Sequence, residues 1–116
     1  MDIRELTTGE IAVLKAKGAL DRMSAGRLGH GIRAAVNRGC RKIVLNLSEI
    51  ESADSRGLGE LLFSCSQSWN QGREILIAQP PPFLRELLLS SNMVPDHIVC
   101  DSLYEALRSA RDSAPL

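Results

Sequence analysis

The feature that most constrains the fold is a short, almost continuously apolar run, Ile43-Val44-Leu45-Asn46-Leu47. A strand with one face in solvent alternates apolar and polar residues, whereas a strand buried on both faces is apolar at consecutive positions. The run therefore predicts a central strand that is covered on both faces. Residues 74–78 have the same character and are expected to form another buried strand.

The N-terminal part of the chain has the pattern of a hairpin. Residues 2–8 and 11–16 are expected to be strands joined by a turn at Thr8-Gly9-Glu10, with Gly18 ending the second strand. Two strands joined so tightly form an antiparallel pair. The sheet is therefore expected to have an antiparallel edge.

Helix-like segments separate the remaining strands. The first two helices are expected from an N-cap at Ser24 to about Arg38 and over about residues 56–70. A third helix follows Pro80-Pro81-Pro82 and ends where Asn92 takes a left-handed conformation. A short strand over residues 97–100 and a helix from a cap at Ser102 to about Arg111 complete the order. The order β-β-α-β-α-β-α-β-α predicts an α/β fold with a mixed, mostly parallel β-sheet and about four helices.

The length of the chain fits one domain. A chain of 116 residues, 44% of them hydrophobic, can bury one core but is too short for two domains. We assign residues 1–112 to this single domain and residues 113–116 to a flexible tail.

The composition argues against several functional classes. The chain has 14 basic and 14 acidic residues and only 3% aromatic residues, which does not suit a nucleic-acid-binding surface. Its three cysteines are scattered, with no CxxC pair and no histidine at metal-ligand spacing, so no metal site is expected. No apolar stretch approaches the roughly 20 residues of a membrane span, and the N-terminus carries no apolar signal segment. We therefore expect a cytoplasmic protein without membrane insertion.

One segment is unusual for a plain strand–helix unit. The apolar strand leads through a polar loop to Asp54-Ser55-Arg56-Gly57-Leu58-Gly59 and then into a helix. This segment resembles the signature of STAS domains, above all of the bacterial anti-sigma-factor antagonists. Gly18-Ala19-Leu20-Asp21 also resembles that family's Gly-Glu-Leu-Asp, and residues 74–93 fit its proline-containing strand-to-helix segment. The resemblance covers nearly the whole chain.

The resemblance implies a protein-binding switch and not an enzyme. In antagonists of this kind, an anti-sigma factor with serine-kinase activity phosphorylates the serine at the position of Ser55. The unmodified form binds the anti-sigma factor and the phosphorylated form releases it. The resemblance also implies a single sheet with its helices gathered on one side. The partner-binding residues expected on this basis are Asp21, Asp54, Ser55, Arg56, Gly57, Leu58 and Phe63.

Ser55 has a simpler alternative role. A serine at a helix start can be an N-cap that accepts a hydrogen bond from a backbone N–H group. The same position also suits a phosphate, which adds a charge of about −1.5 to −2 next to exposed N–H groups and the positive end of the helix dipole. Asp54 is likewise either a cap or a first-turn charge.

Two further side chains also leave alternatives open. Arg56 stands where the family has a small residue, and it could pair with a phosphate on Ser55, pair with Asp21 or Asp54, or obstruct a kinase cleft. Ala19 stands where the family often has Glu. Phe63 lies off the apolar stripe of its helix, so it is either a flanking core residue under a loop or an exposed contact for a partner.

Other functions are also considered. Asp54-Ser55-Arg56-Gly57 is not a G-x-S-x-G elbow, and His30 and His97 lie in other elements, so no catalytic residues are expected. Gly57-x-Gly59 lacks a third glycine, so we expect no tightly bound cofactor. The main alternative function is a STAS subunit that docks on a larger assembly, such as a stressosome scaffold or the ATPase of a lipid-transport ABC system. Weak self-association into a homodimer is compatible with either function.

Overall fold

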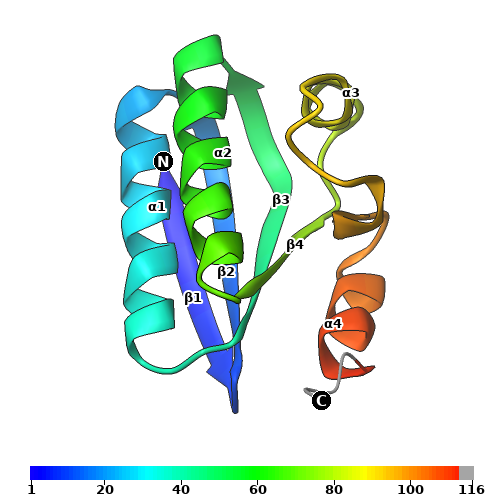
Figure 1. Cartoon of the computed structure of the whole chain (residues 1–116). Helices are drawn as coiled ribbons and strands as arrows, with labels where there is room; N and C mark the ends of the chain where they lie inside the picture. The colour runs from blue at the N-terminus through cyan, green and yellow to red at the C-terminus, as the bar shows by residue number, and fades with distance from the viewer. Residues whose placement is uncertain (113–116) are drawn as a thin grey trace.

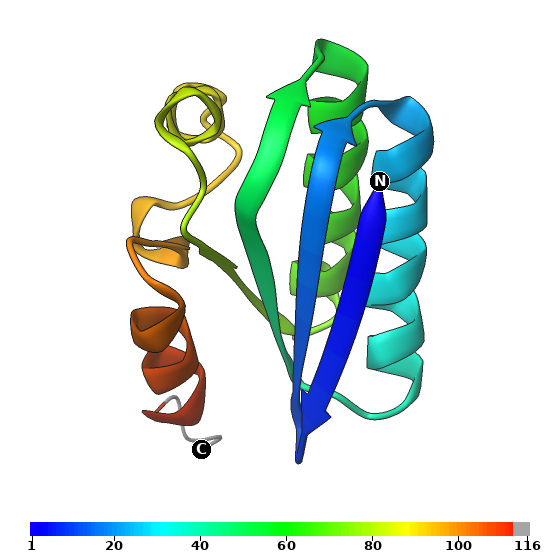
Figure 2. The same ribbon diagram turned by 180° about the vertical axis from the view of Figure 1, so that it is seen from behind.

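The computed structural model describes residues 1–112, so the expected flexible tail over 113–116 lies outside the described residues. Residues 1–112 form one five-stranded sheet with strand order β1-β2-β3-β4-β5 (Figures 1 and 2). The strands are β1 (Asp2–Thr8), β2 (Ile11–Leu20), β3 (Lys42–Ala53), β4 (Glu74–Ala78) and β5 (Val99–Cys100). β1 pairs with β2 antiparallel and every other neighbouring pair is parallel. The predicted α/β fold with an N-terminal hairpin is confirmed.

The helices follow the strands in the predicted order. They are α1 (Arg22–Asn37), α2 (Ser55–Asn70), α3 (Pro82–Ser90) and α4 (Leu103–Asp112), with one turn of 3-10 helix over Asp96–Ile98. That turn occupies the first part of the segment expected to be a strand over 97–100, so β5 is shorter than predicted. Asn92 adopts the left-handed conformation expected after the third helix, with φ of 59°.

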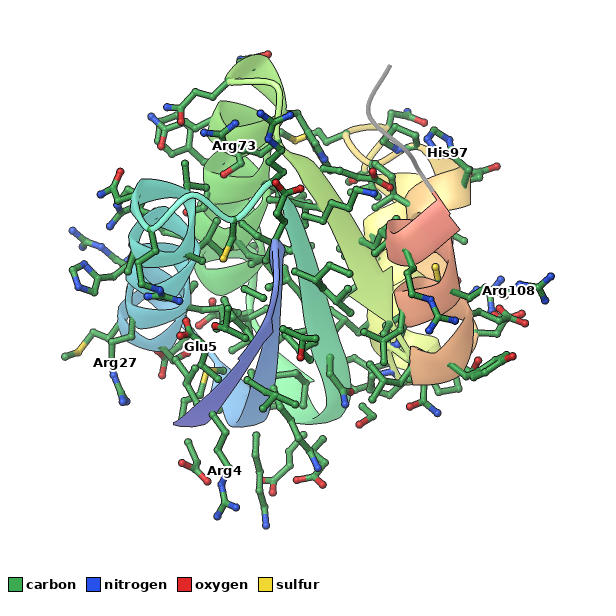
Figure 3. All side chains as sticks on the ribbon, turned by 90° about the horizontal axis from the view of Figure 1, so that it is seen from below. Arg4, Glu5, Arg27, Arg73, His97 and Arg108 are labelled. Carbon is green, nitrogen blue, oxygen red and sulfur yellow. The ribbon has the colours of Figure 1, made fainter. Side chains whose placement is uncertain are left out.

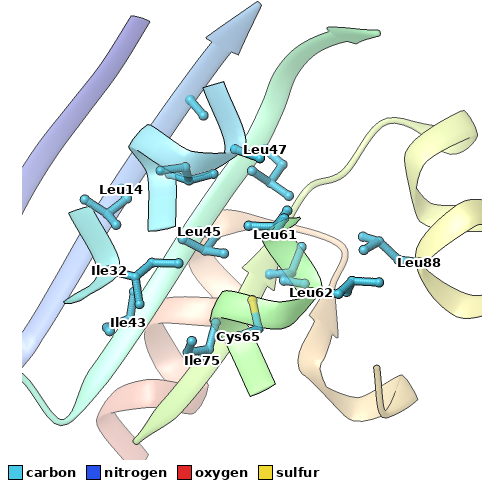
Figure 4. Close-up of a cluster of buried hydrophobic side chains, with 14 of the residues drawn as sticks. Leu14, Ile32, Ile43, Leu45, Leu47, Leu61, Leu62, Cys65, Ile75 and Leu88 are labelled. Atoms are coloured by element: carbon cyan, nitrogen blue, oxygen red, sulfur yellow. The ribbon is translucent and has the colours of Figure 1, made fainter. Parts of the chain in front are cut away.

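The larger core lies between one face of the sheet and α1, α2 and α3 (Figures 1 and 4). Alternate residues of the strands point into it because successive side chains of a strand face opposite ways. Figure 4 shows Leu14, Leu45 and Ile75 of the sheet together with Ile32 of α1 and Leu61 of α2. All five side chains are buried, so this layer is a dry apolar core.

α4 covers the opposite face of the sheet. Ala106 and Ala110 of α4 form a second buried cluster with Val44, Leu76 and Ala78, whose side chains point away from α1 and α2. Figure 3 shows Arg27 of α1 and Arg108 of α4 projecting from opposite sides of the sheet. The expectation that all helices gather on one side is therefore wrong for α4. The cover by α4 explains the apolar run over residues 43–47, because this strand is buried on both faces, as the run predicted.

The two long strands β2 and β3 end at the same edge of the sheet, where α1 and α2 begin. β2 does not end at Gly18 as predicted, because that glycine takes a φ of 117° and the strand continues to Leu20. β3 continues to Ala53, and its register pairs Leu20 with Ala53. Since α1 begins directly after β2 and α2 directly after β3, the two helix starts emerge beside each other.

Candidate functional site

The starts of α1 and α2 are in direct contact. The backbone N–H of Asp54 donates to the carbonyl oxygen of Leu20 over 3.1 Å. Gly57 is buried against the same segment, because a Cβ atom at this position would lie 2.3 Å from the Leu20 oxygen and 2.8 Å from the Asp21 Cα. Gly57, one of the residues expected to bind a partner, is thus buried, and the side where a Cβ would lie is filled by the chain itself.

Asp54 and Asp21 are the N-caps of the two helices. Asp54 accepts a hydrogen bond from the Gly57 N–H over 2.7 Å, so Ser55 is the first helical residue and not the cap. Asp21 accepts from the Ser24 N–H over 2.9 Å, and the Ser24 hydroxyl accepts from the Asp21 N–H in return. This capping box corrects the predicted cap at Ser24. The hydrogen bond from the Ser24 backbone lowers the pKa of the Asp21 carboxyl below its usual value.

Ser55 is exposed and lines an open pocket of about 470 Å³ at the junction of the two helices. Six residues line this junction pocket: Arg22 from α1, and Ser55, Arg56, Gly59, Glu60 and Phe63 from α2. Within the described part of the chain, the Ser55 hydroxyl makes no side-chain hydrogen bond. Ser55 is therefore accessible to solvent, with its hydroxyl unused by the described chain.

Phe63 is 57% exposed, so it is a surface residue and not a core residue under a loop. It lies two turns along α2 from Ser55, on the same pocket. Leu58, in contrast, is half-buried and packs against the larger core. An exposed aromatic ring and an exposed serine on the same pocket give it a mixed apolar and polar lining, which is typical of a protein-contact surface.

The predicted site residues thus separate into two groups. Ser55, Arg56 and Phe63 come together on the pocket surface. Asp21 and Asp54, although exposed, use their carboxylates to cap α1 and α2, and together with buried Gly57 they hold the two helix starts in place.

Sequence reasoning missed Arg22. Arg22 lines the pocket from α1, far from Ser55 in the sequence, and no local pattern signals the proximity. Neither Arg22 nor Arg56 forms a salt bridge with any residue in the range 1–112. The pairing of Arg56 with Asp21 or Asp54 is therefore not seen, and the pocket carries two exposed guanidinium groups.

The described residues offer few groups for other chemistry. No three of their His, Cys, Asp and Glu side chains cluster as a metal site. Cys40, Cys65 and Cys100 are all buried, and burial raises the pKa of the Cys65 thiol to about 12. No helix among residues 1–112 combines the length and apolarity needed to cross a membrane.

Comparisons with known proteins identify the family and the fold. A family model described as "Mlab, STAS domain" matches residues 3–99, a range that includes the whole junction pocket. None of the curated proteins compared matches the chain.

Solved structures of several proteins have the same fold. The anti-sigma factor antagonist SpoIIAA in its unphosphorylated form is 18% identical, with a TM-score of 0.78 over 98% of this chain and 100% of that chain. SpoIIAA from Bacillus in the phosphorylated form is 20% identical, with a TM-score of 0.73 over 93% and 98% of the two chains. A sulfate transporter family protein from Wolinella succinogenes is 16% identical, with a TM-score of 0.79 over 91% and 88%. At these identities the likeness is one of fold.

Proposed function

The chain belongs to the STAS domain family, and on that premise we propose that it is an anti-sigma-factor antagonist whose partner binding is switched off by phosphorylation of Ser55. The observation that carries the proposal is the exposed Ser55 hydroxyl on the pocket between α1 and α2, with the exposed ring of Phe63 on the same surface. A known anti-sigma factor antagonist of the same fold, SpoIIAA, exists in phosphorylated and unphosphorylated forms.

The proposed switch acts through charge and shape. A kinase transfers the γ-phosphoryl group of ATP to the Ser55 oxygen, the hydroxyl loses its proton, and ADP leaves. The modified residue carries about −1.5 to −2 charge where it had a neutral hydroxyl. The free protein tolerates this charge because Ser55 is exposed at a helix start. A partner packed over the pocket would have to bury the charge, so it loses affinity.

The proposed partner is a protein, an anti-sigma factor with serine-kinase activity. In this proposal the chain itself is not an enzyme and works in the cytoplasm. The residues proposed to contact the partner are Ser55, Arg56 and Phe63 on the pocket. Asp21, Asp54, Gly57 and Leu58, also expected to contact the partner, are proposed to act by holding the starts of α1 and α2 that carry this surface.

A docking subunit of a larger assembly is the second candidate function. Arg56 favours it, because this large cation lies beside Ser55 on the pocket, where it could obstruct a kinase. A sulfate transporter family protein also has this fold, so the fold is not restricted to anti-sigma factor antagonists. In this role, the same surface would bind its partner permanently.

Affinity capture with two charge variants separates the two functions. The immobilised wild-type protein, Ser55→Asp and Ser90→Asp are exposed to extract from the source cell, and bound proteins are identified by mass spectrometry. Ser90 is an exposed serine on α3, so its variant controls for the added charge. We expect wild type and Ser90→Asp to retain a serine-kinase ATPase that Ser55→Asp loses. Retention by all three of a component of a transport or scaffold complex would instead support the docking subunit.

A further inference from the structure

We propose that Arg22 is part of the regulatory site and binds the phosphate group that Ser55 carries after modification. This inference rests on the proposed function, to which it adds a phosphate-binding residue from a different helix. Arg22 belongs to the first turn of α1, whereas Ser55 and Arg56 belong to the first turn of α2. The contact between these two turns is what brings Arg22 to the site.

The relative position of the two turns is fixed by the backbone. The Asp54 N–H donates to the Leu20 carbonyl oxygen, and Gly57 packs against Leu20 and Asp21 with no space for a side chain. Asp54 and Gly57, which flank Ser55, are therefore held against Leu20 and Asp21. Arg22 follows Asp21 directly. Arg22 and Ser55 accordingly line the same pocket.

The charges around the pocket leave Arg22 available for an anion. The carboxylates of Asp21 and Asp54 already accept hydrogen bonds from the starts of α1 and α2. Among the six residues that line the pocket the acidic one is Glu60, which lies one turn after Arg56 on α2. An arginine that precedes a glutamate by four residues is in the less favourable order for a helix ion pair, and no such pair is formed within residues 1–112.

Glu60 nevertheless affects the two arginines differently. Its carboxylate lies one turn from Arg56 on the same helix, so its negative charge is near that side chain although the two form no ion pair within residues 1–112. Residues 22–37, which form α1, include no Asp or Glu, and the acidic neighbour of Arg22 at the start of this helix is the N-cap Asp21, whose carboxylate accepts from the Ser24 N–H. Arg22 is thus a cation of the pocket whose neighbouring carboxylate on α1 already caps the helix.

The chemistry of the two groups is complementary. A phosphoserine carries three acceptor oxygens, and a planar guanidinium donates to two of them at once. A phosphate held by Arg22 and Arg56 bridges α1 and α2 across the pocket. The modification then covers the surface next to Phe63 with a fixed, charged group, which is the surface we propose for the partner.

The test uses phosphoserine placed at position 55 during translation, so it requires neither a kinase nor a partner. The second pKa of the phosphate, about 6 in an unstructured chain, is measured by phosphorus NMR titration in the full chain. We expect it to lie lower in the folded phosphoprotein than in the same protein in urea. Arg22→Gln should raise it by roughly 0.2–0.7 pH unit, the size expected for one exposed ion pair. Arg22→Lys should recover part of the lowering.

Arg33→Gln is the matched control, since Arg33 is an exposed arginine of α1 that lies outside the junction pocket. Equal phosphate pKa values in Arg22→Gln and Arg33→Gln would overturn the inference, even if Arg56→Gln raises the value. Circular dichroism spectra equal to wild type confirm that each variant is folded. A partner that binds the phosphorylated and unmodified proteins equally would contradict the proposed function and leave the Arg22–phosphate contact standing.

Discussion

Gly57 at the start of α2 lies so close to Leu20 at the end of β2 that a Cβ atom at position 57 would be 2.3 Å from the Leu20 carbonyl oxygen. No side-chain rotation can relieve this contact, because the atom approached belongs to the backbone. The strand and the helix can therefore meet only where residue 57 has no side chain. This contact places Ser55 beside the start of α1.

Gly57→Ala is expected to destabilise the protein by about 1–3 kcal/mol, the usual cost of forcing an extra carbon into a packed region. Gly59→Ala is the matched control. It lies in the same helix, two residues on, and a Cβ there meets no atom of the described chain within 4 Å. Alanine has the higher helix propensity, so Gly59→Ala should be neutral or stabilising by up to about 1 kcal/mol. Urea unfolding of both variants is the measurement, and equal stabilities would contradict the close contact.

Phe63→Ala is expected to leave the melting temperature almost unchanged, because the ring is more than half exposed. Its effect should appear in partner binding, as a loss of roughly 1–3 kcal/mol if the ring is an interface anchor. Leu61→Ala gives the contrast, since Leu61 is fully buried and its truncation should cost about 2–5 kcal/mol of stability. A large drop in melting temperature for Phe63→Ala would show that the ring supports the core.

Asp21 links stability to pH. Its pKa is lowered in the folded protein, so its contribution to stability is fully present above the unfolded-state pKa of about 4 and is lost as the pH falls through the folded-state pKa. Asp21→Asn keeps a side-chain oxygen for the cap but does not titrate in this range. We expect urea unfolding to show a smaller loss of stability between pH 7 and pH 3 for Asp21→Asn than for wild type. The pKa of Glu49 is also lowered, by its hydrogen bond to Lys15. Glu49 should therefore still lose its contribution to stability at low pH in both proteins, so the Asp21→Asn protein should lose part of its stability as well. Equal losses in the two proteins would contradict the role of the cap.

Arg56→Ser introduces the small residue that the sequence resemblance implies next to Ser55, the serine proposed to be phosphorylated. If Arg56 obstructs the kinase, the variant should incorporate phosphate faster than wild type, as read by intact mass. If Arg56 only steadies the phosphate, incorporation should stay the same while the phosphate pKa rises. No incorporation in either protein would speak against a kinase substrate and for the docking subunit.

The fold could be predicted in most respects because its pattern is local. The consecutive apolar residues from Ile43 to Leu45 indicate cover on both faces, and α4 supplies it on the second face. The expectation that all helices lie on one side of the sheet was inconsistent with these consecutive apolar residues, which require cover on the second face as well. The extension of β2 past Gly18 was missed, because a glycine can end a strand or continue it with a positive φ, and the sequence is the same in both cases.

The site could be predicted only where it is contiguous in sequence. Ser55, Arg56 and Phe63 belong to one helix, so their motif and spacing place them together. Arg22 and the Gly57–Leu20 contact depend on how the ends of two parallel strands meet, which no spacing within one segment encodes. The mistaken cap at Ser24 has a local cause, since Asp21 and Ser24 cap each other and either residue type is a good N-cap.

The most direct test of the central claim is the affinity of the captured partner for four forms of the chain, measured by titration calorimetry. These are wild type, Ser55→Ala, Ser55→Asp and the control Ser90→Asp. The account predicts that Ser55→Ala and Ser90→Asp bind like wild type, while Ser55→Asp binds about tenfold or more weakly with an unchanged melting temperature. Equal affinity for all four forms would contradict a switch at Ser55.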